Sequence, residues 1–340
     1  MNILALETSC DETAVAVVRD GVHVLGSAIS SQVAVHERFG GVVPELASRA
    51  HLEATTPLVA LALQRAQLSL SEVDTIAVTQ GPGLVGALMV GLQTARCLAL
   101  ALDRPLVAVH HIAAHLYAVR LGRPELQLGR HVGLAVSGGH TALYAVDGPA
   151  ELRLLGQTLD DAAGEAFDKV AALLGLGYPG GRRLDALARG GKTDAVALPR
   201  ATLPRRPLDF SFSGLKTSVR TFVQKHGVPT GDALADLCAS FQEAVCDVLV
   251  SKATAAARRE GVDTLVVAGG VACNSRLRER LTHDARRTSP LRVLLPEPRW
   301  CTDNAAMIGG LAFELARAGR YADPWTLDAD PGLGLGWAAA

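Results

Sequence analysis

The chain has 340 residues, of which 49% are hydrophobic and 4% aromatic, and its formal net charge is −1. This length predicts about two domains, and the hydrophobic share suffices for two cores built mainly from Ala, Val and Leu. The near-neutral charge gives no sign of a protein that binds nucleic acid through bulk basicity, although local arginine clusters occur. The six cysteines are scattered and form no CxxC pair, which excludes a disulfide framework.

The N-terminal residues show no targeting pattern. Residues 1–9 lack a basic segment and are followed at once by Asp11 and Glu12, so we expect no signal peptide. The longest apolar stretch, 84–102, contains Gln93 and Arg96, which favours a buried helix over a membrane span. We therefore expect a soluble, cytoplasmic protein.

Two segments share one plan. Residues 3–17 and 132–146 are each typical of a strand, a turn of small and polar residues, and a second strand. A third strand-and-glycine element spans 264–274. Duplicated hairpins that each open a stretch of strands and helices predict an internally repeated α/β protein. This layout resembles the actin-like ATPase superfamily, which implies two duplicated ribonuclease-H-like lobes with a central cleft that binds a nucleotide.

Apolar periodicity predicts the helices between these elements, and they cover 44–66, 84–102, 112–119, 161–174, 234–259 and 302–317. We expect an N-terminal lobe over 1–120, completed by the C-terminal helix around 303–320, and a C-terminal lobe over 121–302. Residues 178–216, rich in Gly, Pro and Arg, are expected to form an irregular insertion, and 323–340 a loose tail.

A run of histidines follows the apolar segment 105–109, which is typical of a buried strand. On a helix, His111 and His115 lie one turn apart on the same face and can bind one metal ion; solvated histidines at a helix end are the alternative. In peptidases of the HExxH type the residue after the first His is a Glu that acts as general base, but here it is Ile112, which argues against that chemistry. Asp303 either completes a two-His, one-carboxylate set suited to Fe(II) or Zn(II), or caps the last helix.

Glycine-rich turns follow two of the predicted strands. Ser137–His140 (Ser-Gly-Gly-His) and Gly269-Gly270 with Asn274 can bring backbone N–H groups close to a phosphate. The alternatives are a plain hairpin turn for the first and a helix cap for the second.

Three carboxylates share one face of the predicted helix 161–174. Asp161, Glu165 and Asp168 form either a solvated acidic face or part of a site. The small residues 162–164 indicate that another part of the molecule approaches this helix closely. Asp185 follows a Pro-Gly-Gly turn and is a candidate for the same site.

Several motifs occur together and in a fixed order. They are Glu7–Thr13 (ETSCDET), Gly41–Arg49 (GVVPELASR), Gly81–Leu84 (GPGL), His110-His111 with His115, Ser137–Thr141 (SGGHT), Asp161–Lys169 (DAAGEAFDK), Ser211–Lys216 (SFSGLK) and Cys301–Asn304 (CTDN). In combination they resemble the universal tRNA threonylcarbamoyltransferase family, formerly called O-sialoglycoprotein endopeptidases. The resemblance runs from about residue 1 to 318. No motif is broken, and Trp300 stands where a Phe is more familiar.

The resemblance implies the reaction and its site. The threonylcarbamoyl group passes from threonylcarbamoyl-adenylate to N6 of adenosine 37 in tRNAs that read codons beginning with A, and AMP is released. One metal ion, Fe(II) or else Zn(II), is implied at His111, His115 and Asp303. The implied adenylate site is lined by Ala135, Val136, Ser137, Gly138, Gly139, His140, Asp168, Gly181, Asp185 and Asn274.

The chemistry agrees with these residue types. The donor is a mixed anhydride and already activated, so no covalent enzyme nucleophile is required, and a metal with open positions can polarise its carbonyl group. Adenine N6 is a poor nucleophile, so a carboxylate that accepts its proton would help. Asp11 and Glu12 are the candidates, and a polar hairpin tip is the alternative for both.

Other functions stay open at this point. An ATPase or small-molecule kinase of the same fold would need Mg²⁺ held by acids. A metallopeptidase is a further alternative, and the missing Glu after His111 argues against it. A non-catalytic scaffold subunit is another, and the complete set of His111, His115 and Asp303 argues against that.

The resemblance also implies partners. Its bacterial branch implies tRNA, a paralogous actin-like subunit without the metal site and a small ATPase, with no membrane; archaeal and eukaryotic relatives pair with a small kinase instead. We expect the arginine-rich stretch 182–206 to contact tRNA.

Overall fold

The computed structural model describes residues 1–149, 151–288 and 291–334. The chain divides into two compact units, which we term unit 1 (Met1–Gly129, Asp147–Leu152 and Thr302–Ala340) and unit 2 (Arg130–Val146 and Arg153–Cys301).

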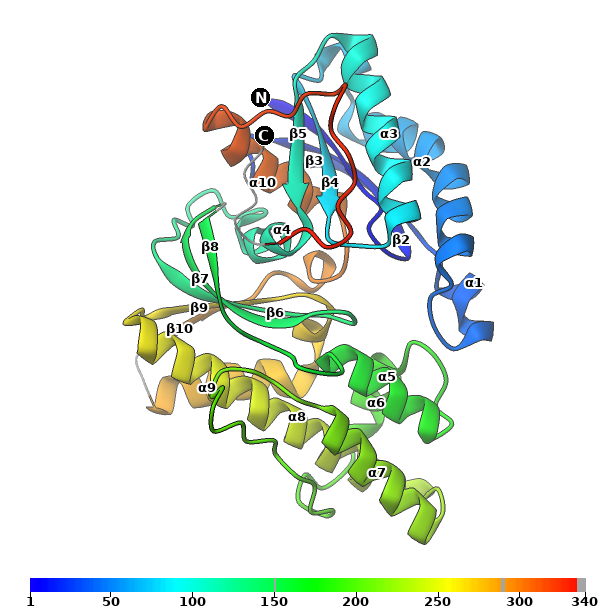
Figure 1. The fold of residues 1–340 in the computed structure, drawn as a ribbon, viewed down its shortest axis with the longest axis vertical. Helices are drawn as coiled ribbons and strands as arrows, with labels where there is room; N and C mark the ends of the chain where they lie inside the picture. The colour runs from blue at the N-terminus through cyan, green and yellow to red at the C-terminus, as the bar shows by residue number, and fades with distance from the viewer. Residues whose placement is uncertain (150, 289–290, 335–340) are drawn as a thin grey trace. The chain divides into compact units, whose positions relative to one another are not determined.

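Unit 1 is built on a five-stranded sheet in the order β3-β2-β1-β4-β5 (Figure 1). Its strands are β1 (Asn2–Glu7), β2 (Glu12–Arg19), β3 (His23–Ser31), β4 (Thr75–Gly81) and β5 (Leu106–His110). β1 pairs antiparallel with β2 and parallel with β4, which pairs parallel with β5. The carboxyl ends of β1, β4 and β5 therefore meet at one edge of the sheet.

Helices cover both faces of this sheet, which is why its central strands are mostly apolar, with polar residues such as Glu7 and Thr79 near their carboxyl ends. On one face α2 (Pro44–Ala66) and α3 (Val85–Leu102) pack against Leu4, Leu6 and Val15. On the other face Gly309 of α10 (Ala305–Arg317) lies against Ala5 and Val18. Figure 1 shows α10 across the sheet from α2 and α3. The alternation of strand side chains thus supplies two apolar surfaces from one set of strands.

Among the described helices, α3 is the one whose length and composition would allow it to cross a membrane. Its small face, with Gly91, Leu92 and Ala95, is buried. Val85 and Met89 on the other face are exposed. The expectation of a buried helix is therefore right for one face only.

Unit 2 repeats the same sheet, in the order β10-β9-β6-β7-β8. Its strands are β6 (His131–Val136), β7 (Thr141–Gly148), β8 (Glu151–Gln157), β9 (Thr264–Ala268) and β10 (Arg292–Leu294). β6 pairs antiparallel with β7 and parallel with β9, and β9 pairs parallel with β10. The predicted internal duplication is confirmed, because these pairings match those of β1, β2, β4 and β5.

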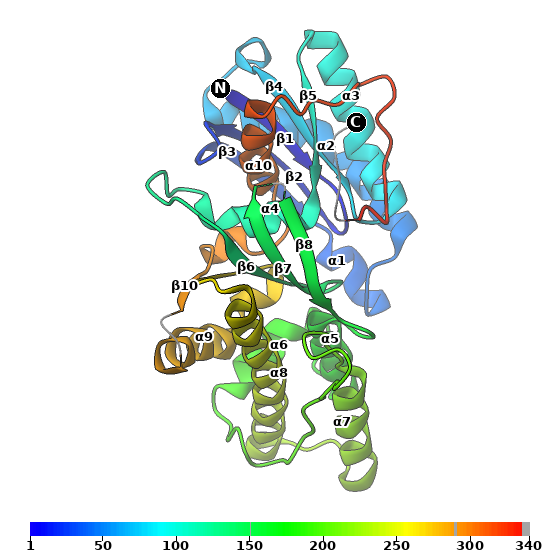
Figure 2. The ribbon, with the colours of Figure 1, turned by 60° about the vertical axis from the view of Figure 1, so that its left-hand side comes forward.

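The helices of unit 2 pack around a second core. They are α5 (Ala163–Leu173), α6 (Gly180–Ala188), α7 (Ser213–His226), α8 (Gly231–Glu260) and α9 (Ser275–Thr288). Val132 and Leu134 of the sheet belong to the same buried cluster as Val245 and Leu249 of α8. Figure 2 shows α8 and α9 side by side.

The long predicted helices are confirmed to within a few residues, but two predictions of irregular structure are wrong in part. Residues 189–212 are irregular as predicted. The rest of 178–216 contains α6 and the start of α7, because Leu184 and Ala188 bury an apolar helix face that the surrounding Gly and Arg residues conceal in the sequence. The tail is not loose over 323–334, because Arg96 donates to the carbonyl oxygens of Pro324 (2.5 Å) and Trp325 (2.9 Å). The rest of the predicted tail, 335–340, lies outside the described residues.

Candidate functional site

Three side chains of unit 1 converge as the sequence predicts. His111 and His115 lie on α4 (His111–Tyr117), and Asp303 directly precedes Asn304, the N-cap residue of α10. Asp303 Oδ1 lies 3.1 Å from His115 Nε2 and 3.6 Å from His111 Nε2. One potential ligand atom from each residue falls within 4.8 Å of the others. Both imidazoles are buried, so the alternative of solvated histidines is wrong.

His110 explains why α4 begins where it does. Its Nδ1 accepts the backbone N–H groups of Ile112 and Ala113, which are two of the unpaired donors at the helix start. Its Nε2 lies 3.2 Å from the carbonyl oxygen of Leu333. With Nδ1 used as the cap, His110 fixes where α4 begins, and the spacing of one helical turn then places His111 and His115 on one face.

Asn304, and not Asp303, caps α10. The Asn304 side chain accepts the backbone N–H of Met307 at 3.0 Å. The alternative prediction, that Asp303 caps this helix, is therefore wrong, because Asn304 does so. The Asp303 carboxylate instead faces the two imidazoles, with 20% of its side chain exposed.

A buried carboxylate that the sequence analysis missed supports this cluster. Glu7, at the end of β1, is fully buried and lies 3.0 Å from His111 Nδ1. Burial disfavours the charged form of both groups, but their mutual attraction wins: it lowers the pKa of Glu7 and, with help from Asp303, raises the pKa of His111 to about 9. The available signal was a carboxylate that ends an otherwise apolar, fully buried strand.

The donor set fits a metal ion. Two imidazole nitrogens and one carboxylate oxygen, buried and aimed at each other, are the ligands that Fe(II) or Zn(II) prefers, and three protein ligands leave positions for water or substrate. That His111, His115 and Asp303 hold such an ion stays a prediction.

Asp11 and Glu12 lie at the tip of the β1–β2 hairpin. Burial raises the pKa of Asp11, and the charge of Asp303 raises it further. Glu12 accepts the hydroxyl hydrogen of Ser31 at 2.9 Å. The structure thus brings Asp11 into the electrostatic reach of the cluster, while a catalytic role for either residue stays a prediction.

In unit 2, the Ser137–His140 turn joins β6 to β7. The Ser137 N–H donates to the His140 carbonyl oxygen at 2.8 Å, and the Gly164 N–H donates to the Ser137 carbonyl oxygen at 3.1 Å. A Cβ at Gly164 would lie 2.6 Å from that oxygen and 2.8 Å from the backbone of Gly138. The prediction that small residues admit a close neighbour to this helix is confirmed, and the neighbour is the turn itself. A Cβ at Gly138 or Gly139 would meet no atom within 4 Å, so the turn is open on its outer side.

Asp168 separates from the other two acids of its helix. Its Oδ1 accepts the N–H groups of Gly180 (2.8 Å) and Gly181 (3.2 Å) at the start of α6. Asp161 and Glu165 instead pair with Lys169, at 2.7 and 2.8 Å. The alternative of a purely solvated acidic face is wrong.

Asp185 and Asn274 both hold the N-terminus of α9. Asp185 Oδ1 accepts the Ser275 hydroxyl at 2.7 Å and its N–H at 3.2 Å. Asn274 Oδ1 accepts the Leu277 N–H at 3.0 Å, and its Nδ2 donates to Gln242 Oε1 at 2.9 Å. The structure therefore brings these two predicted residues together, and it also gives each of them a structural task.

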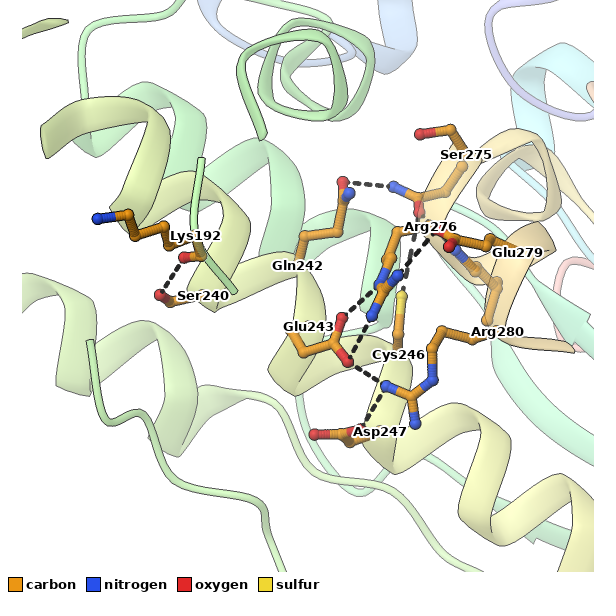
Figure 3. Close-up of polar contacts among 12 residues, drawn as sticks. Lys192, Ser240, Gln242, Glu243, Cys246, Asp247, Ser275, Arg276, Glu279 and Arg280 are labelled. Atoms are coloured by element: carbon orange, nitrogen blue, oxygen red, sulfur yellow. Dashed lines mark hydrogen bonds and ion pairs between the residues drawn. The ribbon is translucent and has the colours of Figure 1, made fainter. Parts of the chain in front are cut away.

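Ion pairs fix α9 against α8 just beyond this point. Figure 3 shows Glu243 and Asp247 of α8 facing Arg276 and Arg280 of α9. Arg276 Nε lies 2.6 Å from Glu243, and Arg280 pairs with both acids. Because these side chains are largely buried, the network is worth more than exposed pairs and anchors the helix that presents Asn274.

Comparison with known proteins adds the following. Residues 23–310 match the family model described as tRNA N6-adenosine threonylcarbamoyltransferase. Relatives of that name include one from Anaeromyxobacter sp. (strain Fw109-5), 55% identical over 96% of this chain and 100% of its own length. Another, from Trichlorobacter lovleyi, is 57% identical over 91% of this chain and 90% of its own.

Solved structures show the fold alone, because their sequence identities are low. The (R)-2-hydroxyglutaryl-CoA dehydratase component A of Acidaminococcus fermentans superposes with a TM-score of 0.54 at 14% identity, over 93% of this chain and 99% of that one. The ROK hexokinase of Thermus thermophilus gives 0.50 at 16%, over 94% and 100%. These are proteins of the actin-like ATPase fold, which confirms the predicted fold class.

Proposed function

Because the chain belongs to the tRNA N6-adenosine threonylcarbamoyltransferase family, we propose that it modifies adenosine 37 of tRNAs that read codons beginning with A. The group transferred is threonylcarbamoyl, the donor is threonylcarbamoyl-adenylate, and AMP is released. The observation that carries this proposal is 55% identity to a transferase of that name across the whole length of the relative.

We place one Fe(II), or alternatively Zn(II), at His111, His115 and Asp303. The burial and convergence of these donors support the placement, as does the use of Asn304 for the capping task. When bound, such an ion would act as a Lewis acid toward the donor's carbonyl or phosphate oxygen. Metal dependence is accordingly part of the proposal.

We assign adenylate binding to unit 2. The backbone N–H groups of the open turn at Gly138 and Gly139 would hold the phosphate, with Ala135, Val136 and His140 around it. Asp185 would bind the ribose hydroxyls, and Asn274 would line the same site. Asp168 would act through the start of α6, where it holds the N–H of Gly181.

The proposed reaction needs no covalent intermediate on the enzyme. The lone pair of adenine N6 attacks the carbamoyl carbon, the bond from that carbon to the phosphate oxygen breaks, and AMP leaves with the bonding electrons. The N6 proton passes to a base, for which Asp11 is the first candidate and Glu12 the second. The raised pKa of Asp11 suits it to accept that proton.

We further propose partners and location. The name of the bacterial relatives supports tRNA as substrate. A paralogous actin-like subunit and a small ATPase as partners, and action in the cytoplasm, are part of the proposal. Within the arginine-rich stretch, Arg183 and Arg200 already bind Leu176 and Asp247 of this chain. Arg205 is exposed and is the better candidate for a tRNA contact.

A transfer assay tests the proposal. The protein and the proposed partner subunits are mixed with labelled threonylcarbamoyl-adenylate and an unmodified tRNA, and a tRNA carrying G at position 37 serves as control. We expect label on adenosine 37 and none on the control. Absence of label with active donor present, together with hydrolysis of ATP or phosphorylation of a small molecule by this chain without its partners, would favour the kinase or ATPase alternative.

A further inference from the structure

We infer that Glu7 is a positioning residue that selects the imidazole tautomer of His111, so that Nε2 is the nitrogen presented to a metal ion. The inference rests on the metal site proposed above and deepens it. Glu7 acts through His111.

The contacts of Glu7 define what it can do. Glu7 Oε1 accepts the backbone N–H of Ser9 at 2.6 Å, and Oε2 accepts the hydroxyl of Thr79 at 2.6 Å. An ionised carboxylate has no hydrogen to donate. The contact of 3.0 Å between Oε2 and His111 Nδ1 must therefore be donated by the imidazole, which places a proton on Nδ1. A neutral imidazole carries one proton, so Nε2 keeps its lone pair.

The other edge of the ring then faces the cluster. His111 Nε2 lies 3.6 Å from Asp303 Oδ1, and the two imidazole rings stand edge to face at 4.6 Å. A carboxylate that holds the second nitrogen of a metal-bound histidine fixes the orientation of the ring and raises its basicity as a ligand. Glu7 occupies that position relative to the proposed ion.

The fold builds this arrangement into the sheet. Glu7 ends β1, Thr79 lies in β4, and His111 directly follows β5; these three neighbouring strands are parallel. Their carboxyl ends meet at one edge, and burial keeps water from competing for the contacts. The geometry is thus set by strand register.

Replacement of Glu7 by Gln reverses the selection without changing the shape of the side chain. If the amide oxygen accepts the Ser9 N–H, the amide NH₂ points at Thr79 and His111. The Thr79 hydroxyl can rotate to accept one amide hydrogen, and the other is donated to His111 Nδ1, which places the ring proton on Nε2, where it blocks a metal. The Ser9 hydroxyl, whose oxygen lies 3.2 Å from the same Nδ1, can donate to it as well. If the amide is turned over, its NH₂ meets the buried Ser9 N–H, and two donors face each other without an acceptor.

Both consequences lower metal affinity. The first amide orientation satisfies all its hydrogen bonds and will dominate, so the ion must first force the other tautomer. Once the imidazole is neutral, the loss of the negative charge acts in the same direction, because that charge attracts a divalent cation bound at Nε2. Substitutions of such supporting groups lower metal affinity by about 10- to 100-fold, and we expect a loss in that range.

The test measures Zn(II) affinity of the full chain by competition with a chromophoric chelator at about pH 10, above the pKa of about 9 of His111, so that the imidazole is neutral in both proteins and proton competition does not enter the comparison. We expect Glu7→Gln to bind about 10- to 100-fold more weakly than wild type. Glu45→Gln, the same change at an exposed carboxylate, should bind as wild type does. Equal affinity of Glu7→Gln and wild type would overturn the inference and leave the metal site standing. If His115→Ala binds zinc as tightly as wild type does, that result would instead contradict the metal site itself.

A second readout follows the ring proton directly, in variant protein whose native fold is first checked by circular dichroism. Nitrogen-15 spectra of the histidine side chains identify which ring nitrogen carries the proton. In zinc-loaded wild type, we expect the His111 signal to show a hydrogen-bonded Nδ1–H. At about pH 10, where His111 is neutral, metal-free wild type should also carry its proton on Nδ1 and folded, metal-free Glu7→Gln should carry it on Nε2. A zinc-bound Nδ1 in wild type would overturn the inference.

Discussion

Acid should weaken metal binding strongly, because a proton and a metal ion compete for the same nitrogen of His111. Glu7 and Asp303 raise the pKa of His111 from 6.5 to about 9, against the opposing effect of burial. In the folded, metal-free protein, His111 therefore stays doubly protonated through the neutral pH range. Its neutral form makes up only about 1% of the population at pH 7. Apparent affinity should rise by about tenfold for each pH unit and level off above pH 9.

Zinc competition at about pH 6, 7 and 8 measures this dependence, and the expected change over the range is about 100-fold. His111→Ala removes the competing site, so its remaining weak binding should lack most of the slope. An affinity of wild type that stays constant between those pH values would show that His111 is already neutral. That result would refute the electrostatic account of the Glu7, His111 and Asp303 contacts.

Three further predictions concern single positions. Asp11→Asn should slow transfer by about 10²- to 10⁴-fold with little effect on adenylate affinity; equal losses in both would exclude a role as base. Gly164→Ala places a Cβ 2.8 Å from the backbone of Gly138, so it should weaken adenylate binding in calorimetry while leaving zinc affinity intact, and unchanged adenylate binding would count against the assigned turn. Asn304→Ala removes the cap of α10 and should lower the free energy of unfolding by about 1 kcal/mol, with weaker zinc binding because Asp303 precedes the cap; denaturant titration that shows no loss would contradict the capping role.

Local patterns in the sequence predicted much of unit 1 and its candidate metal site. The spacing of His111 and His115 depends on one helical turn, which periodicity reveals. Glu7 was missed because its partners lie on β4 and after β5, and the register of those strands is a tertiary property. A charged residue at the end of a buried strand showed that a partner must exist, but not which one.

Unit 2 shows the opposite case, where residue type alone was ambiguous. Asp168, Asp185 and Asn274 were singled out as binding residues, and each also holds a helix N-terminus. Asp and Asn serve both purposes with the same atoms, so their positions in the sequence could not separate the two. Composition misled in a similar way over 178–216, where Gly, Pro and Arg conceal the apolar face of α6.

The tail was misjudged for a different physical reason. Residues 323–334 form no helix or strand, and besides Leu327, which packs against the core of unit 1, they are held by hydrogen bonds to their backbone, such as those from Arg96 to Pro324 and Trp325. Backbone contacts of this kind leave no mark in the sequence of the segment itself.

The central claim is that a metal held by His111, His115 and Asp303 is needed for threonylcarbamoyl transfer. The most direct test measures bound metal and label on adenosine 37 in the same preparations of wild type and Asp303→Ala, each assembled with the proposed partners. We predict one metal ion per wild-type chain with transfer, and loss of both in the variant. Full transfer by a variant that binds no metal would contradict the claim.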